Sequence, residues 1–148
     1  MHFLPDDRAR GRHPAGLAPA DGHRIYGCDD CQLVCPWNRY AQRSALPDFD
    51  ERQGLVGQQL VTLLGWSEAD FLRLTEGSPI RRIGHERWLR NVAVALGNAL
   101  RTALPEGAVP WLAALQARLD HPSSLVREHV AWALQQSSAA PTEPTLLN

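Results

Sequence analysis

All three cysteines of the sequence fall within one short stretch, residues 27–38, which reads GCDDCQLVCPWN. Cys28, Cys31 and Cys35 follow the spacing Cys-x2-Cys-x3-Cys, and Pro36 comes directly after the last of them. Thiolates at such short spacing can bind a metal ion or an iron–sulfur cluster, because neighbouring side chains then reach the same centre. A 4Fe–4S cluster takes four thiolates, however, and this chain has three cysteines.

The stretch matches the last three cysteines and the proline of the bacterial ferredoxin run C-x2-C-x2-C-x3-C-P. Ile25 stands where that run has its first cysteine. In that run the fourth cysteine binds a second cluster, so Cys28 and Cys31 would bind one cluster and Cys35 would bind another. The remaining ligands of two clusters would then have to come from elsewhere.

Two other kinds of site remain open on these residues alone. His23 could complete a Cys3His zinc site with the three cysteines, which would make the chain a helical-repeat binding module. A stand-alone ferredoxin-like electron carrier is the second alternative, and its cluster would need an open or non-cysteine ligand. A disulfide with one spare thiol is disfavoured, because we expect a reducing compartment.

Composition describes an ordinary globular protein. The chain has 148 residues, of which 44% are apolar and 21% charged, and this is enough for one domain with a core. The formal net charge of −1 provides no global basic field, so a surface for nucleic acid would have to be local. We expect a cytoplasmic location and no membrane partner, because neither a membrane-spanning apolar run nor a secretory signal is present.

The sequence predicts a mainly α fold in four parts. Residues 1–24 show no periodicity and are predicted to be irregular, and residues 25–59 form the ferredoxin-like cysteine segment. Residues 60–137 carry helical patterns, and residues 138–148 are predicted to be a disordered tail.

Helix signals are strongest between Ser67 and residue 136. Ser67 and Asp70 form a capping-box pattern, and apolar residues recur at helical spacing through 85–100. The segments AVALGN at 93–98 and AWALQQ at 131–136 are similar, which favours a HEAT-like helical repeat. The five tryptophans are predicted to be core residues, although Trp37 beside Pro36 could instead shield a cluster.

Two stretches of the chain, RIYGCDDCQLVCPWNRYAQ and GSPIRRIGHERWLRNVAVALGNAL, resemble the C-terminal part of bacterial epoxyqueuosine reductases. The resemblance covers roughly residues 10–138. It implies a cytoplasmic, monomeric enzyme that completes queuosine at the wobble position of tRNA. It further implies two 4Fe–4S clusters, a cobalamin cofactor, and a HEAT-like domain that helps to hold the tRNA.

The cluster ligands carry over from this resemblance residue by residue. Cys28 and Cys31 match the family's pair on one cluster, and Cys35 matches the ligand that completes the other. The remaining cysteines, the cobalamin pocket and the catalytic acid of the family lie upstream of the matched region, so no catalytic residue is expected here. The resemblance implies that this chain is the end of a larger enzyme, completed by a missing N-terminal half or a separate polypeptide.

A local basic group follows in the second stretch, and its members are Arg81, Arg82, Arg87 and Arg90. Arginine suits bidentate contact with phosphate, and residues 87 and 90 share one face of a helix. The alternative is a solvated helix face with internal ion pairs, such as Glu86 with Arg90. The resemblance favours contact with tRNA.

Overall fold

The computed structural model describes residues 24–27, 29–42, 44–47, 55 and 57–137. Regular secondary structure within these ranges is entirely helical, which confirms the prediction of a mainly α chain. The predicted irregular segment 1–24, apart from Arg24, and the predicted tail 138–148 lie outside the described residues. Among the described residues, no helix is both long and apolar enough to cross a membrane.

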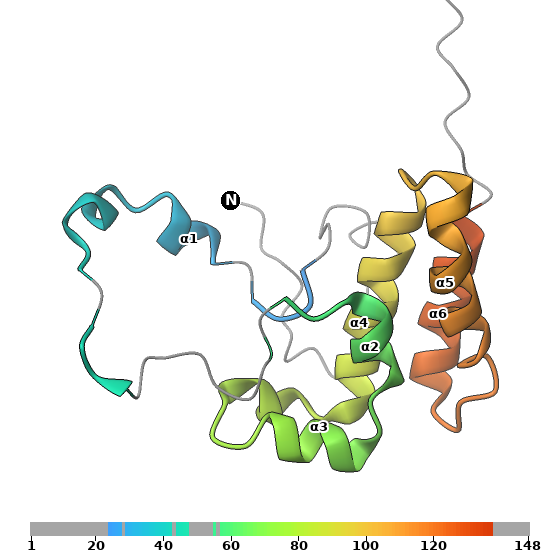
Figure 1. Cartoon of the computed structure of the whole chain (residues 1–148). Coiled ribbons are helices and arrows are strands. Elements are labelled where there is room, and N and C mark those ends of the chain that lie inside the picture. Colours follow the sequence, from blue (N-terminus) through green and yellow to red (C-terminus); the bar gives the residue numbers. More distant parts are fainter. Residues whose placement is uncertain (1–23, 28, 43, 48–54, 56, 138–148) are drawn as a thin grey trace, which may run out of the picture.

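The described helices fall into two groups along the chain. The cysteine segment holds the single turn α1 (Asp30–Leu33) and the 3₁₀ helix η2 (Pro36–Tyr40). The helical unit comprises α2 (Leu60–Gly65), α3 (Glu68–Leu74), η4 (Pro79–Ile83), α4 (His85–Leu100), α5 (Pro105–Gln116) and α6 (Ser124–Gln136). Figure 1 shows α1 and η2, drawn in blue and cyan, lying apart from the helical unit.

Helix α3 begins where the sequence predicts. The Ser67 hydroxyl accepts a hydrogen bond from the backbone N–H of Asp70, and the Asp70 carboxylate accepts one from the Ser67 N–H. This reciprocal capping box satisfies two backbone donors that the first helical turn would otherwise leave unpaired. The Ser67 hydroxyl also donates to the Asp70 carboxylate at 2.6 Å, and this bond is the main reason that the pKa of Asp70 lies below its usual value.

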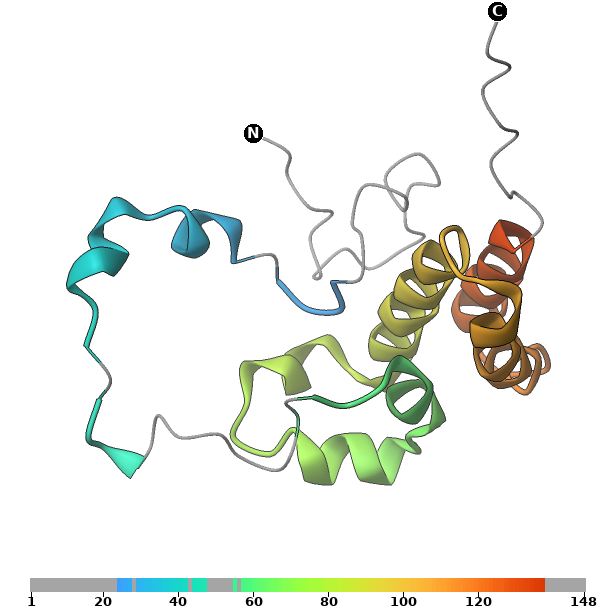
Figure 2. The same cartoon turned by 45° about the horizontal axis from the view of Figure 1, so that its top comes forward.

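Helices α4 and α6 form the central packing of the helical unit and run side by side in Figures 1 and 2. Both contain the similar segments that suggested a repeat. Gly97 of α4 lies so close to α6 that an added Cβ would be 2.6 Å from Trp132 Cζ3 and 2.9 Å from Ala133 Cα. A side chain larger than hydrogen would therefore force the two helices apart.

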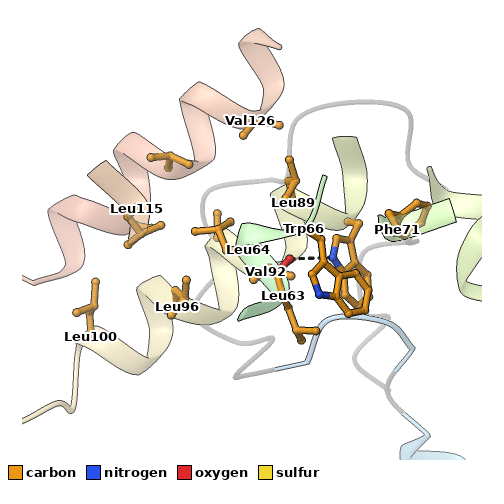
Figure 3. Packing of buried hydrophobic residues seen from close by; sticks show 14 of the residues in the cluster. Leu63, Leu64, Trp66, Phe71, Leu89, Val92, Leu96, Leu100, Leu115 and Val126 are labelled. Atoms are coloured by element: carbon orange, nitrogen blue, oxygen red, sulfur yellow. Dashed lines mark hydrogen bonds between the residues drawn. The ribbon is translucent and has the colours of Figure 1, made fainter. Parts of the chain in front are cut away.

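The core lies between α4 and the helices around it (Figure 3). The indoles of Trp66 and Trp88 stack at 5.3 Å between ring centroids, and the Trp88 Nε1–H donates to the Leu63 carbonyl. This bond lets a large aromatic side chain be buried without an unpaired donor. Trp66 and Trp88 are buried, so the prediction that they are core residues is confirmed. Trp111 and Trp132 are half-buried against the same core, so the prediction is partly met for them.

The start of helix α5 is one boundary that the sequence pattern missed. The pattern predicts a helix from Val109, whereas α5 begins at Pro105 and includes Pro110 in its interior. Proline fits the first helical position because its missing N–H would have no partner there. Pro110 has no N–H to donate to a carbonyl of the preceding turn, so the sequence pattern predicts the start of a helix there and not its interior.

Candidate cluster ligands and basic surface

Cys31 and Cys35 lie on a short, tightly turned part of the chain. The turn α1 begins after Asp29, whose φ of 52° is in the left-handed region, and the N–H groups of Gln32 and Leu33 both donate to the Asp29 carbonyl. Cys31 sits inside this turn, and Cys35 is the residue just before η2. Both thiols are free, Cys31 exposed and Cys35 half-buried. Free thiols on an exposed turn are accessible to a metal centre.

The Asn38 side chain closes the loop that contains Cys35. Its Nδ2–H donates to the Gln32 carbonyl at 2.6 Å and to the Leu33 carbonyl at 3.4 Å. The last carbonyls of α1 are thereby satisfied by a side chain that lies beyond Cys35 in the sequence. No role was predicted for Asn38 from the sequence, although asparagine is one of the residue types whose side chains hydrogen-bond to nearby backbone groups.

The described residues contain two free thiols but no complete metal site. Among them, no group of three or more His, Cys, Asp or Glu side chains lies close enough to hold a metal ion. Cys28 and His23 lie outside the described residues, so the first cluster pair and the Cys3His alternative stay predictions. Cysteine thiolates are the ligands that iron–sulfur clusters take. Two 4Fe–4S clusters, however, need more ligands than the three cysteines of this chain provide.

Four large apolar side chains close to the two cysteines in the sequence are exposed. Leu33 is 72% exposed, Val34 78%, Trp37 72% and Tyr40 59%. We call these four residues the apolar face. The prediction that Trp37 is a core residue is wrong, because its indole contacts Tyr40 at 5.6 Å between ring centroids and lies outside the core of the helical unit. Where exposed apolar side chains form one contiguous patch, that patch usually marks an interaction site.

One side chain of α4 ties the cysteine segment to the helical unit. The Asn91 Nδ2–H donates to the Ile25 carbonyl at 2.7 Å, and Ile25 and Tyr26 pack against the core. The Arg90 Nε–H in turn donates to Asn91 Oδ1 at 3.0 Å. Arg90 and Asn91 therefore fix the segment around Ile25, which leads to the cysteines, against α4. Asn91 was not predicted from the sequence, although its polar side chain stands among the apolar positions of α4 and needs a hydrogen-bond partner when buried.

The four predicted RNA-contact arginines do not share one surface. Arg81 and Arg82 of η4 are exposed, and neither has a carboxylate partner among the described residues. Arg87 is half-buried and donates to the Ile83 carbonyl at 2.8 Å, which ties α4 to η4. Arg90 is 2% exposed, so the prediction that it contacts RNA is wrong, as is the alternative that it lies on a solvated helix face. Of these four arginines, Arg81 and Arg82 are therefore the exposed ones.

The backbone carbonyls of Leu64 and Trp66, at the end of α2, accept hydrogen bonds from distant side chains, which the sequence did not predict. We call these two carbonyls the carbonyl hub. The Trp66 carbonyl accepts hydrogen bonds from His85 Nε2 at 2.9 Å and from Arg118 Nη2 at 3.3 Å. Arg118 Nη2 also donates to the Leu64 carbonyl at 2.8 Å. The guanidinium of Arg118 suits this position because the carbonyl end of a helix carries partial negative charge. The hub joins α2, α4 and the residues after α5.

These features define a helical protein with an exposed, thiol-bearing segment tied to one of its helices. The chain is homologous to epoxyqueuosine reductases: it is 65% identical over 127 residues to that of Alicycliphilus denitrificans and 56% over 126 residues to that of Xanthomonas campestris pv. campestris. It is 53% identical over 131 residues to that of Escherichia coli. The predicted resemblance is confirmed.

These matches cover only part of the relatives. About 85% of this chain is aligned in each case, against 35%, 34% and 31% of the three relatives, so the chain spans about a third of the length of the curated relatives that it matches. A solved structure described as selenomethionine-labelled epoxyqueuosine reductase has a similar fold, with a TM-score of 0.60 and 19% identity. That match covers 88% of this chain and 42% of the other. No family model matches the chain.

Proposed function

We propose that this chain is a part of an epoxyqueuosine reductase that supplies thiolate ligands to two 4Fe–4S clusters and part of a surface for tRNA. The whole enzyme would reduce epoxyqueuosine to queuosine in tRNA, in the cytoplasm and as a monomer. The observation that carries the proposal is the 52–65% identity with proteins of that name over most of this chain. The relatives' names describe whole proteins, about a third of whose length is matched here.

The cysteines divide between two clusters in this proposal. Cys28 and Cys31 would be ligands of one cluster, and Cys35 would be a ligand of the other. When bound, such clusters supply single electrons for reduction. The chain's own contribution is to hold two free thiols on the turn of α1 and η2, braced by Asn38 and anchored through Asn91. No residue of this chain is proposed to bind cobalamin or to act as the catalytic acid.

The remaining cluster ligands would come from a polypeptide that this chain does not contain, either an N-terminal part of a longer chain or a separate protein. The apolar face supports this, because its four side chains lie on the same short segment as Cys31 and Cys35. A polypeptide that brought further thiolates to these cysteines would also cover the face.

The helical unit would provide the tRNA surface, through Arg81 and Arg82, with Arg87 beside them. Two adjacent exposed guanidinium groups without carboxylate partners among the described residues suit phosphate oxygens. We further propose that the helical unit is HEAT-like, which the side-by-side packing of the similar segments in α4 and α6 supports.

Metal analysis under anaerobic conditions tests the cluster proposal. The chain is assayed alone and together with the complementary two thirds of the Alicycliphilus denitrificans relative. We expect little iron on the chain alone, and about eight iron and eight sulfide ions per complex. Cys31→Ser and Cys35→Ser should each remove about half of the iron, because each affects a different cluster, so each variant serves as the control for the other.

Two outcomes would contradict this proposal. One zinc and no iron on the chain alone would indicate the helical-repeat module with a Cys3His site, in which His23→Ala would lose the zinc. About four iron and four sulfide ions on the chain alone would indicate a stand-alone ferredoxin-like electron carrier.

A further inference from the structure

An ion pair lies on the turn that carries the thiol of Cys31. Arg24 Nη2 donates to Asp30 Oδ1 at 2.5 Å, and Asp30 is the first residue of α1. Cys31 follows Asp30 directly, so their Cα atoms are about 3.8 Å apart. The Asp30 carboxylate and the Cys31 thiol therefore project from the same turn of the chain.

The backbone beside Arg24 is fixed by the helical unit. Asn91 of α4 donates to the Ile25 carbonyl at 2.7 Å, and Ile25 packs against the core. Figure 1 shows the blue segment that contains Arg24 and Ile25 leading to α1. Hydrogen bonds thus connect α4, through residues 24 and 25, to the turn that carries Cys31. Arg24 is held by its backbone on one side and by Asp30 on the other.

The two aspartates that precede Cys31 differ in their partners. Asp30 is paired with Arg24, whereas Asp29 has no cationic partner among the described residues. The side chains of the pair are 43% and 53% exposed, and an ion pair of this kind contributes little to folding. Its consequence is therefore electrostatic. Without Arg24, two carboxylates with no paired cation would precede the thiol.

Charge beside an iron–sulfur cluster changes the reduction potential of that cluster. Reduction adds an electron, so a nearby cation favours the reduced state and a nearby carboxylate disfavours it. With Arg24 in place, the pair of Arg24 and Asp30 adds almost no net charge beside Cys31. Loss of either partner would leave one full charge there.

We propose that Arg24 sets the reduction potential of the iron–sulfur cluster at Cys31 by neutralising the Asp30 carboxylate. This inference rests on the proposed function, because it requires a cluster at Cys31. Arg24 is a positioning residue in this role, since it acts on the cluster through its pairing with Asp30 and is not a ligand.

Charge variants of the pair test the proposal. The chain is assembled anaerobically with the complementary two thirds of the Alicycliphilus denitrificans relative and titrated with dithionite, while electron paramagnetic resonance follows the reduced clusters. The reduction step that is missing in Cys31→Ser belongs to the cluster at Cys31. Arg24→Gln should move this step to lower potential, and Asp30→Asn should move it to higher potential. The double variant should return close to the unchanged value, because the two removed charges lie 2.5 Å apart and act from nearly the same place.

Two controls separate an electrostatic role from a structural one. Arg24→Lys keeps the positive charge, so the potential should stay close to that of the unchanged complex. Arg101→Gln removes the same charge far from the pair and should leave the potential unchanged, because exposed Arg101 lies about 15 Å along α4 beyond Asn91. Iron is measured in every variant and should stay at the level of the unchanged complex, since the ion pair contributes little to folding.

The same measurements distinguish this inference from the proposed function. If the unchanged complex holds iron and Arg24→Gln leaves the potential unaltered, the inference alone is wrong. Shifts in the same direction for Arg24→Gln and Asp30→Asn, or equal loss of iron in Arg24→Gln and Arg24→Lys, would also overturn it. If the unchanged complex binds no iron, the cluster part of the proposed function fails, and the inference fails with it.

Discussion

Arginine side chains a few residues apart in this chain have opposite environments. Arg81 and Arg82 are exposed, whereas the Arg90 guanidinium is buried and donates to Asn91, which holds the chain that leads to the cysteines. A buried guanidinium is stable only with its donors paired, so Arg90 has a structural task. Residue type alone gives no information on this difference.

Acidification should destabilise the folded chain through His121. Its pKa is lower folded than unfolded, where the usual value is 6.5, so the unfolded chain binds more protons between these two values. The stability that the neutral ring provides is present above the unfolded pKa, and it is lost as pH falls through the window below 6.5. Urea unfolding at a series of pH values should show this loss, and His121→Gln should reduce it. An unaltered pH profile in His121→Gln would contradict the prediction.

At the scale of helices, the contact of α4 with α6 depends on the absence of a side chain at Gly97. Gly97→Ala should destabilise the chain, because overpacking costs about 1–3 kcal/mol and the better helix propensity of alanine offsets only about 1 kcal/mol of this. Thermal unfolding followed by circular dichroism measures the effect as a lower Tm.

Gly107 is the matched control for this change. It lies in α5 with nothing within 4 Å of an added Cβ and without a positive φ, so Gly107→Ala should leave the Tm equal or slightly higher. If Gly97→Ala were as stable as Gly107→Ala, the close approach of α4 and α6 would be wrong.

For the whole molecule, we expect the apolar face to be the surface through which the chain joins the further polypeptide that the proposed clusters require. Leu33→Ser with Val34→Ser removes two exposed aliphatic side chains, and it should weaken association about tenfold or more, because burying each contributes about 1.5–3 kcal/mol. Sedimentation velocity of mixtures with the complementary part of the Alicycliphilus denitrificans relative measures this.

The control replaces exposed aliphatic side chains elsewhere on the molecule. Leu104→Ser with Val109→Ser acts at α5 and should leave association unchanged, although these residues are also 79% and 62% exposed. Equal effects of the two pairs would mean that the apolar face has no special part in assembly. Emission from Trp37 should also shift to shorter wavelength on association, as its indole leaves water.

The sequence by itself determined the features that depend on near neighbours. The capping box of Ser67 and Asp70 was predicted because its partners are three residues apart, and α4 and α6 because their apolar residues recur within each helix. The short spacing of the cysteines likewise predicted where the thiols gather. The start of α5 was missed, since Pro110 conceals that the helix continues through it.

Only the tertiary structure decided which side chains are buried and which distant backbone groups they bond to. Arg90 is buried and Trp37 exposed, contrary to the sequence reading, because burial depends on which distant segments pack over a residue. The Trp66 carbonyl is held by His85, 19 residues away, and by Arg118, 52 residues away. Such contacts form when the chain brings distant residues together, so no local pattern of residues could predict them.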